Sequence, residues 1–446
     1  MAPLECPDGA AASEGRVGEG VDRRTRPINA KGPPDPESFF KVDWPDAVAR
    51  NGRRAATDAA RLGLGPLAIK VDGKVWTVEP RGETIGVVPG RAEASSPCIT
   101  LDRPAFADLF CERRTALGLV VGARVAGDPD SCDAFCAWDP LFRSLLDGRP
   151  VYQAGEITLL SADCSPLELD QRFHLGEQTP EAAHFLAETG FVLLRGVFTE
   201  AEMDAVDADL AHAVGAAQVD DGSSWWATTR TGERYPCRIL DFAPKSAALR
   251  ALIADDRYLA IGELLGDGHR PGDPFGEHFA DVTGEGLLKR VDSVDGLVCL
   301  PWHKDCDRGG HSMFCAGLTI GICLTAVDDA HGGLDVMAGS HRANIARTQI
   351  DGPLDLPAVT LRAERGDVTV HMSCTLHRST HPRSAERRVA YTGFALPPRP
   401  GDAHAEEVAT AQRAGGHRGI QRPRTDRPRL ERRAMTWESG QVRWPQ

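Results

Sequence analysis

Two regions of regular hydrophobic and polar patterning can be recognised along the chain. The first follows a leader, residues 1–45, which is rich in glycine, proline and charged residues and is expected to be flexible. Residues 46–62 are expected to form a helix. The alternating segments 67–71 and 74–78 then flank an Asp-Gly dipeptide, which favours the tight turn of a β-hairpin.

The remainder of this first region continues with short alternating strands and helices. A short strand is expected at 98–101, a helix at 102–111, a further strand near 119–125 and a helix at 131–146. Residues 46–152 are therefore predicted to form a small α+β domain.

The second region begins after a linker, residues 153–178. The segment 179–189 carries proline at its first helical position and ends before a glycine, and the apolar segment 191–194 is expected to be a strand. Thr199 and Glu202 have the spacing of a capping box, and apolar residues at helical spacing follow them. A second helix is therefore expected to begin there.

Short strands separated by glycine-containing turns dominate the chain from about residue 287 to residue 396. The expected strands are 297–299, 318–324, 359–361, 368–371 and 389–396. Many short strands of this kind are typical of a β-sandwich or a β-barrel. A second domain is therefore predicted over 179–400, and the Arg- and Pro-rich residues 401–446 are expected to be a solvated tail.

Composition narrows the possible partners. The net charge of -13 argues against general binding to nucleic acid or to an anionic membrane. No apolar run reaches the ~20 residues of a membrane span, and no apolar segment near Met1 resembles a signal peptide. The twelve cysteines include no CxxC pair, so reduced thiols in a cytoplasmic protein are expected rather than a zinc site or a disulfide framework. The oligomeric state is not predicted.

A His-x-Asp sequence offers two metal ligands in the second region. Along a strand, residues two positions apart project to the same face, so His303 and Asp305 can reach one cation while Lys304 points away. Imidazole combined with carboxylate suits Fe(II), and two histidines with one carboxylate leave coordination positions open. A third ligand from a distant strand is therefore expected.

Five downstream histidines could supply this third ligand. His311 lies too close in sequence, on a glycine turn. His331 is expected in a turn, and His341 is expected to make structural hydrogen bonds. His371 and His377 both follow a Gly-Asp turn, and their even spacing would place them on one face of a continuous strand, so parity does not choose between them.

The position of Arg388 in the sequence favours His377 over His371 as the third metal ligand. It could return on the next strand beside this histidine, and an arginine fork there can grip a carboxylate with two hydrogen bonds. Ser379 would share the face of His377 and add a hydroxyl group. Alternatively, Arg388 is a surface charge, because Arg387 adjoins it and would face the other way.

The ordered set of motifs resembles the phytanoyl-CoA dioxygenase family over about residues 180–397. The matching motifs are Pro301-Trp302-His303-Lys304-Asp305, Gly332-Gly333-Leu334-Asp335-Val336, Gly339-Ser340-His341, Gly366-Asp367-Val368 and His377-Arg378-Ser379 with Arg388. The chain departs from the family pattern at Arg378 and Cys306, where glycine is common, and both residues are expected to narrow the pocket.

This resemblance implies an α+β protein with a double-stranded β-helix core and flanking helices. It also implies Fe(II) held by His303, Asp305 and His377, and 2-oxoglutarate anchored by Arg388 with help from Ser379. Lys289 or Arg290 is a further candidate for contact with the cosubstrate.

The first domain resembles sterol-carrier-protein-2-like domains. The resemblance rests on the hairpin, on the phrase Ile99–Leu109 and on the Gly127-Asp128 turn, and it implies an apolar site for acyl chains or sterols. The expected protein is thus an Fe(II)/2-oxoglutarate-dependent dioxygenase. It would use O2 to hydroxylate a C–H bond of a small organic substrate, first of all a lipid or acyl thioester (acyl-CoA), with release of succinate and CO2. The alternatives are a catalytically degenerate lipid-binding scaffold and a hydroxylase of a small amino acid or secondary metabolite.

Overall fold

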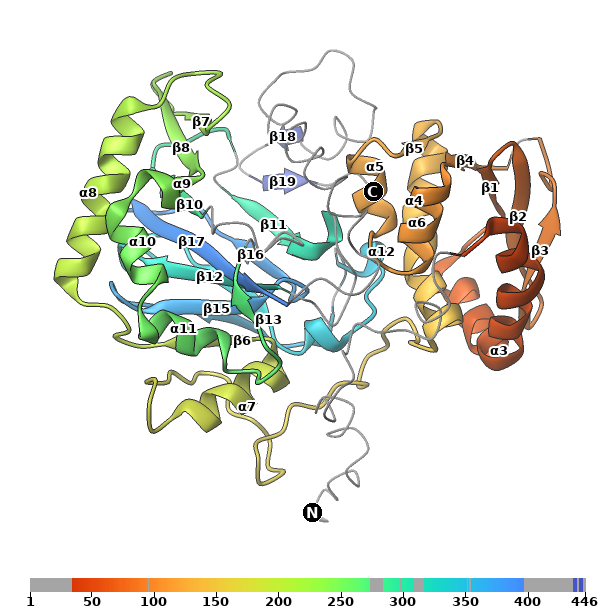
Figure 1. Ribbon diagram of the computed structural model, residues 1–446, viewed down its shortest axis with the longest axis horizontal. Helices are drawn as coiled ribbons and strands as arrows, with labels where there is room; N and C mark the ends of the chain where they lie inside the picture. Colours follow the sequence, from red (N-terminus) through yellow and green to blue (C-terminus); the bar gives the residue numbers. More distant parts are fainter. Residues whose placement is uncertain are drawn as a thin grey trace.

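The computed structural model forms a mixed α+β protein with two regions, here called the front domain (residues 36–152) and the second domain (residues 179–396), joined by the linker 153–178 (Figure 1). It describes residues 34–94, 96–272, 284–296, 299–308, 317–350, 352, 354–396, 436–438 and 441–443.

One mixed sheet carries the front domain, in the order β3-β2-β1-β4-β5, with β1 and β4 parallel. Its strands are β1 (Leu67–Val71), β2 (Lys74–Arg81), β3 (Thr84–Pro89), β4 (Cys98–Leu101) and β5 (Val125–Ala126). Its helical segments are α2 (Pro36–Ser38), the π-helical turn η2 (Phe39–Asp43), α3 (Trp44–Leu62), α4 (Arg103–Phe110), α5 (Ala116–Val121) and α6 (Pro129–Asp147). The expected hairpin and the helices at 46–62, 102–111 and 131–146 are confirmed to within a few residues.

Two predictions for this domain are wrong. The leader was predicted to extend to residue 45, but residues 36–45 are helical and bury Phe39, Phe40 and Trp44 in the domain core. The strand near 119–125 is mostly helix α5. The N-cap residue Thr115, which precedes the helix, accepts a hydrogen bond from the Gly118 amide at 2.9 Å, and this cap outweighs the strand preference of the valines.

The second domain contains a large and a small antiparallel sheet. The large sheet has the order β6-β15-β12-β17-β10-β8-β7, with β9 paired to β17, and the small sheet has the order β11-β16-β13-β14. The large sheet comprises β6 (Phe191–Leu194), β7 (Ser224–Thr228), β8 (Arg234–Leu240), β9 (Arg270–Pro271), β10 (Glu285–Lys289), β12 (Gly317–Cys323), β15 (Val368–Met372) and β17 (Arg387–Ala395). The small sheet comprises β11 (Leu300–His303), β13 (Leu334–Met337), β14 (Ala358–Leu361) and β16 (His377–Ser379).

Helices cover one face of the large sheet, and the small sheet lies on its other side (Figure 1). The helical segments are α7 (Thr179–Thr189), α8 (Glu200–Ala216), α9 (Phe242–Lys245), α10 (Ala247–Ile253), α11 (Asp256–Gly262), the 3-10 turns η3 (Asp305–Arg308) and η4 (Ser340–Arg342), and α12 (Arg347–Ile350). The capping box at Thr199 and Glu202 is present at the start of α8, as predicted.

The expected strands at 318–324, 359–361, 368–371 and 389–396 correspond to β12, β14, β15 and β17. The strand expected at 297–299 begins later, at Leu300 in β11, and residues 297 and 298 lie outside the described part of the chain. Of the tail 401–446, only the short paired strands β18 (Thr436–Glu438) and β19 (Gln441–Arg443) are described.

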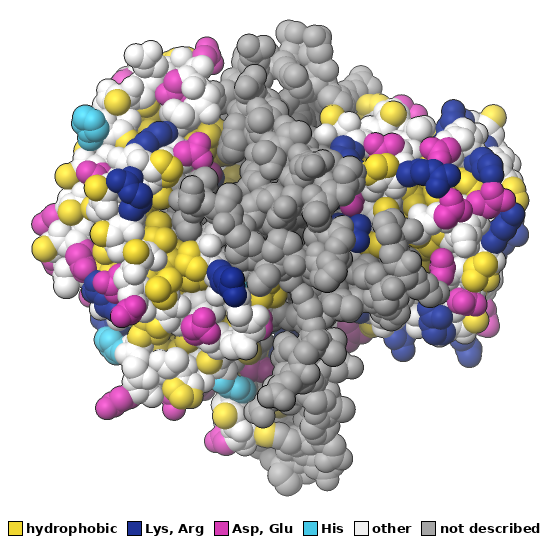
Figure 2. Space-filling view, viewed as in Figure 1, with side chains coloured by type: hydrophobic (Ala, Val, Ile, Leu, Met, Phe, Trp, Pro, Cys, Tyr) yellow, Lys and Arg dark blue, Asp and Glu magenta, His cyan; other side chains and the backbone are white. Residues whose placement is uncertain are grey.

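Among the cysteines that the structure describes, nine form no disulfide, as expected, but Cys164 is disulfide-bonded, so the prediction of reduced thiols is wrong at that position. None of the helices described is both long and apolar enough to cross a membrane. On the face of the front domain seen in Figure 2, acidic and basic side chains are interspersed.

Candidate active site

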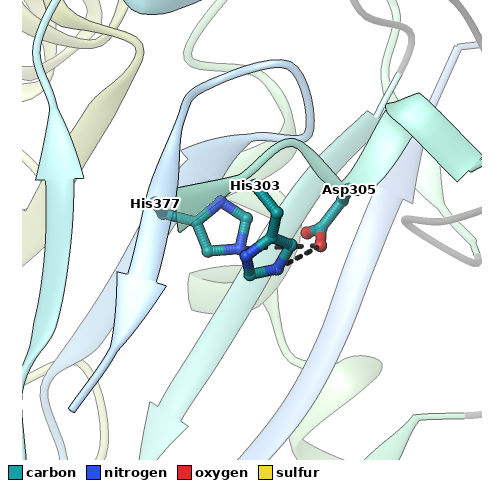
Figure 3. Close-up of side chains that lie close together, drawn as sticks. All are labelled: His303, Asp305 and His377. Atoms are coloured by element: carbon teal, nitrogen blue, oxygen red, sulfur yellow. Dashed lines mark ion pairs between the residues drawn. The ribbon is translucent and has the colours of Figure 1, made fainter. Parts of the chain in front are cut away.

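Three side chains of the second domain converge at one end of the small sheet (Figure 3). His303 is the last residue of β11, and His377 is the first residue of β16. These two strands are antiparallel neighbours, and the two histidines face each other across the pair, with ring centroids 4.2 Å apart. Asp305 lies two residues beyond His303, at the start of η3.

These three side chains offer one ligand atom each, and the atoms lie within 4.8 Å of one another. The Nε2 atoms of His303 and His377 are each 3.5 Å from Oδ1 of Asp305. Two imidazole nitrogens and one carboxylate oxygen on one side of a cation form the donor set of a non-haem Fe(II) site. The residues therefore fit such a metal.

Hydrogen bonds fix the orientation of both imidazole rings. Nδ1 of His303 lies 2.7 Å from the carbonyl oxygen of Pro301, and Nδ1 of His377 lies 3.0 Å from that of Thr375. A carbonyl oxygen can only accept, so each Nδ1 carries the hydrogen and each Nε2 presents a lone pair to Asp305 and to a metal. This is the tautomer that metal-binding histidines adopt when a second group holds the other nitrogen.

Asp305 is also held in place. Oγ1 of Thr319 on β12 donates to its Oδ2 at 3.1 Å, so the large sheet orients a carboxylate in η3, the turn that follows β11 of the small sheet. Burial raises the pKa of Asp305, but the neighbouring histidines, His377 foremost, outweigh this and hold it well below its ordinary value. Burial also lowers the pKa of His303. Deprotonated carboxylate and neutral imidazole are the forms that bind a metal.

His371 lies next to this cluster but outside it. It projects from β15 opposite Thr319, its Nε2 is 3.5 Å from Oδ2 of Asp305, and its ring centroid is 4.3 Å from that of His377. Neither of its ring nitrogens has a hydrogen-bond partner, and burial lowers its pKa to about 4. The structure therefore groups His377, rather than His371, with His303 and Asp305.

The remaining histidines among the third-ligand candidates have other surroundings. His331 is in a turn, with its Nδ1 2.7 Å from a carboxylate oxygen of Asp328. His341 lies with its Nε2 3.0 Å from the carbonyl oxygen of Ala187, which is a structural hydrogen bond as expected. His311 lies outside the described residues.

The prediction that Arg388 lies beside the ligands is wrong. Its guanidinium reaches Asp207 on α8, with Nη1 2.9 Å from a carboxylate oxygen, and its Nε donates to Glu386 at 2.6 Å. The face of β17 that carries Arg388 is the face covered by helices. Because side chains alternate along a strand, Arg387 projects to the opposite face, towards the small sheet.

Arg387 and Lys289 bring two buried basic side chains to that inner face. They are cross-strand neighbours on β17 and β10, and each is 1% exposed. Nζ of Lys289 donates to Oγ of Ser379 at 2.8 Å, and Ser379 is two residues from His377. Arg387 donates to the carbonyl oxygen of Gly333 at 3.2 Å, while its buried Nε has no hydrogen-bond partner.

Neither cation forms an ion pair with a carboxylate among the described residues. Burial, reinforced by the charge of Arg387, holds the pKa of Lys289 well below its ordinary value. Buried cations are normally paired, and the unpartnered Nε of Arg387 marks a missing acceptor. A dicarboxylate such as 2-oxoglutarate fits this place, because one of its carboxylates would supply the missing acceptor and a charge of opposite sign.

The remaining expected neighbours point elsewhere. Arg378 does not narrow the pocket, because its Nε donates to Asp335 at 2.8 Å and its guanidinium stacks over Trp302 at 4.9 Å, on the face of β16 opposite to His377. Arg290 pairs with Glu233 at 2.9 Å near the surface, so Lys289 is the inward member of that pair of candidates. Cys306 is buried in the core of the second domain.

Two interior residues of the site, Arg387 and Thr319, were not predicted as site residues from the sequence. The signal for Arg387 was present in the adjacent arginines, since one of two neighbours on a strand must face inward, but the register of β17 against β10 decides which one. Thr319 could not have been found, because its contact with Asp305 depends on how the two sheets pack.

Residues 186–390 match the model of the family described as phytanoyl-CoA dioxygenase (PhyH). A sequence search of curated proteins finds no match. Among solved structures, similarity is found to EvdMO1 (23% identity, TM-score 0.39, 48% of this chain and 49% of that chain). Similarity is also found to AviO1 from Streptomyces viridochromogenes Tue57 (18% identity, TM-score 0.38, 48% of this chain and 94% of that chain). HygX from Streptomyces hygroscopicus, with nickel and 2-oxoglutarate bound, is similar as well (20% identity, TM-score 0.37, 49% of this chain and 86% of that chain).

The matched segment holds the whole three-residue cluster and both buried cations. The cofactors of this site are Fe(II) and 2-oxoglutarate. The family model covers a little under half of the chain, and over residues 186–390 the protein is similar to the phytanoyl-CoA dioxygenase family of Fe(II)/2-oxoglutarate-dependent oxygenases.

Proposed function

We propose that the protein is an Fe(II)/2-oxoglutarate-dependent hydroxylase, with His303, Asp305 and His377 as the metal ligands. The observation that carries this proposal is the convergence of two Nε2 lone pairs and one carboxylate, with both Nδ1 atoms held by backbone carbonyls. The donor set is complete, which argues against a degenerate scaffold that has lost its chemistry.

The cosubstrate would be held by Arg387, Lys289 and Ser379 rather than by Arg388. In this arrangement the guanidinium of Arg387 and the ammonium of Lys289 would bind a carboxylate of 2-oxoglutarate. Ser379, which already accepts from Lys289, keeps that ammonium directed inward. Pairing with an anion would also restore the charged state of Lys289, since an opposite charge favours the protonated amine.

The proposed core is a double-stranded β-helix. Contacts between the inner faces of the two antiparallel sheets support it, because Thr319 of the large sheet reaches Asp305 and Lys289 reaches Ser379 of the small sheet. When bound, Fe(II) and 2-oxoglutarate supply the oxidising power for the reaction, in which O2 is consumed and succinate and CO2 are released. The protein orients the substrate and keeps the site dry.

A C–H bond of a small organic molecule is the proposed target, and acyl thioesters and other lipids are the first class to test. The front domain gives this class limited support. Aromatic rings of the domain itself fill its core. The ring centroids of Phe39 and Phe110 lie 4.5 Å apart, and those of Trp44 and Phe142 lie 6.4 Å apart. An acyl chain would have to displace these rings.

Succinate formation tests the proposal. The protein with Fe(II), 2-oxoglutarate and a panel of acyl-CoAs, free fatty acids, sterols and amino acids should give one product heavier by one oxygen atom, with matching succinate. His303→Ala and Asp305→Ala should abolish the succinate that depends on substrate. Unchanged turnover in both variants would exclude this metal site.

A further inference from the structure

The turn formed by residues 340–344, here called the η4 turn, holds the segment that carries His303 and Asp305. Between these two residues, Lys304 points away from the cluster and is 3% exposed. Its Nζ donates to the carbonyl oxygens of Ser340 and Ala343, each at 3.2 Å. The backbone that connects the two proposed ligands is therefore fastened to the η4 turn.

The same turn also holds the segment of the third proposed ligand. The amide of Leu376, the residue before His377, donates to Oγ of Ser340 at 2.8 Å. This hydroxyl donates in turn to the carbonyl oxygen of Met337 at 2.7 Å. One buried turn thus contacts both chain segments from which the ligands project.

Asn344, at the end of the η4 turn, fastens it to the front domain. Its side chain is 3% exposed, and Nδ2 donates to the carbonyl oxygens of Pro140 and Arg149, each at 2.9 Å. Its own carbonyl oxygen accepts from the amide of Tyr152 at 2.9 Å. Three hydrogen bonds through one residue therefore connect the front domain to the turn.

A second contact between the domains involves the turn η3, which follows β11. Helix α5 of the front domain packs against η3, which begins with Asp305 (Figure 1). Helix α6 packs against α12, shortly after the η4 turn. The front domain therefore touches the segment that carries the ligands directly, and reaches it a second time through Asn344.

We propose that the front domain is a positioning element of the metal site and that Asn344 is the residue through which it acts. The inference rests on the proposed ligands His303, Asp305 and His377. Outer contacts that orient ligands affect metal affinity by about 10- to 100-fold when they are removed, because a ligand set must be held within a fraction of an ångström. The path from Pro140 to Lys304 runs through the buried side chains of Asn344 and Lys304, with hydrogen bonds of 2.9 and 3.2 Å to backbone carbonyl oxygens, and such contacts can transmit a constraint.

Metal and cosubstrate binding in the full-length protein tests the proposal. Asn344→Ala removes the donors to the front domain, and Lys304→Met removes the ammonium while keeping the aliphatic chain. Under anaerobic conditions, titration of each variant with Fe(II) and 2-oxoglutarate, followed by visible charge-transfer absorption, should show affinity for Fe(II) weakened by about tenfold or more.

Asp355→Ala is the matched control. Asp355 accepts from the Tyr152 hydroxyl and from the Gly155 amide, at 2.7 Å for the latter, so it joins the same parts of the chain without contacting the η4 turn. This variant should retain Fe(II) affinity within about threefold. The proposal is overturned if Asn344→Ala and Lys304→Met bind Fe(II) like the wild type, or if Asp355→Ala is weakened as much as Asn344→Ala.

If Asn344→Ala does not fold, hydrogen exchange of the wild-type protein tests whether the front domain is coupled to the metal site. Coupling is reciprocal, so binding of Ni(II) with 2-oxoglutarate should slow amide exchange at residues 149–152, and leave the β2–β3 hairpin unchanged. Unchanged exchange at 149–152 would contradict the proposal. Absence of any charge-transfer band in the wild type would instead refute the proposed function, so the two failures are distinguishable.

Discussion

Removing the guanidinium of Arg387 should weaken 2-oxoglutarate binding far more than removing that of Arg388. Arg387 is 1% exposed, lies opposite Lys289 and keeps a buried Nε without a partner. Arg388 projects to the helix-covered face, where it pairs with Asp207, and its side chain is 31% exposed. The two neighbours therefore differ in face, in partner and in exposure to solvent.

The expected magnitudes differ accordingly. A hydrogen bond between charged groups in a buried site contributes about 1.5–3 kcal/mol, and each 1.4 kcal/mol or so corresponds to a tenfold change in affinity. Arg387→Met should therefore raise the Kd for 2-oxoglutarate about 10- to 100-fold. The partly exposed pair of Arg388 contributes roughly 0–1 kcal/mol to folding, so Arg388→Ala should lower stability slightly and leave the Kd unchanged.

The assay is an anaerobic titration of the Fe(II)-loaded protein with 2-oxoglutarate, repeated by calorimetry with Ni(II). Because Arg387 also donates to the carbonyl oxygen of Gly333, thermal unfolding of Arg387→Met is measured alongside, to separate lost binding from lost folding. A weakened Arg388→Ala together with an unaffected Arg387→Met would refute the assignment of the inner face of β17.

Three further predictions follow from the same site. Burial lowers the pKa of Lys289 in the free protein, so the nearby carboxylate of 2-oxoglutarate should raise this pKa again and binding should take up a proton at a pH between the two pKa values. Calorimetry in buffers of different ionisation enthalpy measures the uptake, and Lys289→Met should abolish it. Thr319→Val removes the hydroxyl that orients Asp305 and should weaken Ni(II) binding about tenfold; an unchanged Kd would exclude that role. The metal-free protein should lose stability as pH falls from about 6.5 to about 4, because unfolded His371 binds a proton that the buried ring refuses, and urea unfolding of His371→Asn should show a shallower pH dependence.

Local sequence signals predicted the parts of the fold that depend on neighbouring residues. The hairpin of β1 and β2 follows from its Asp-Gly turn, and α8 begins at the capping box formed by Thr199 and Glu202. In contrast, α5 replaced an expected strand, because one capping side chain outweighed the intrinsic preference of a valine-rich segment.

In the candidate site, too, residue spacing along the chain predicted some contacts, and the others depend on how distant segments pack. Spacing along the chain identified His303 and Asp305, and the structure brings them together with His377. Spacing could not decide between Arg387 and Arg388, since that choice depends on the register of β17 and on an acidic partner, Asp207, in a distant helix. Contacts that arise only from packing of two sheets or two domains leave no pattern in a single sequence.

The most direct test of the central claim is the visible absorption of the protein with Fe(II) and 2-oxoglutarate in the absence of O2. A charge-transfer band should appear on addition of 2-oxoglutarate to the wild type and to His371→Asn, and it should be lost in His377→Ala. A band that survives in His377→Ala and disappears in His371→Asn, or no band in the wild type, would contradict the proposed metal site.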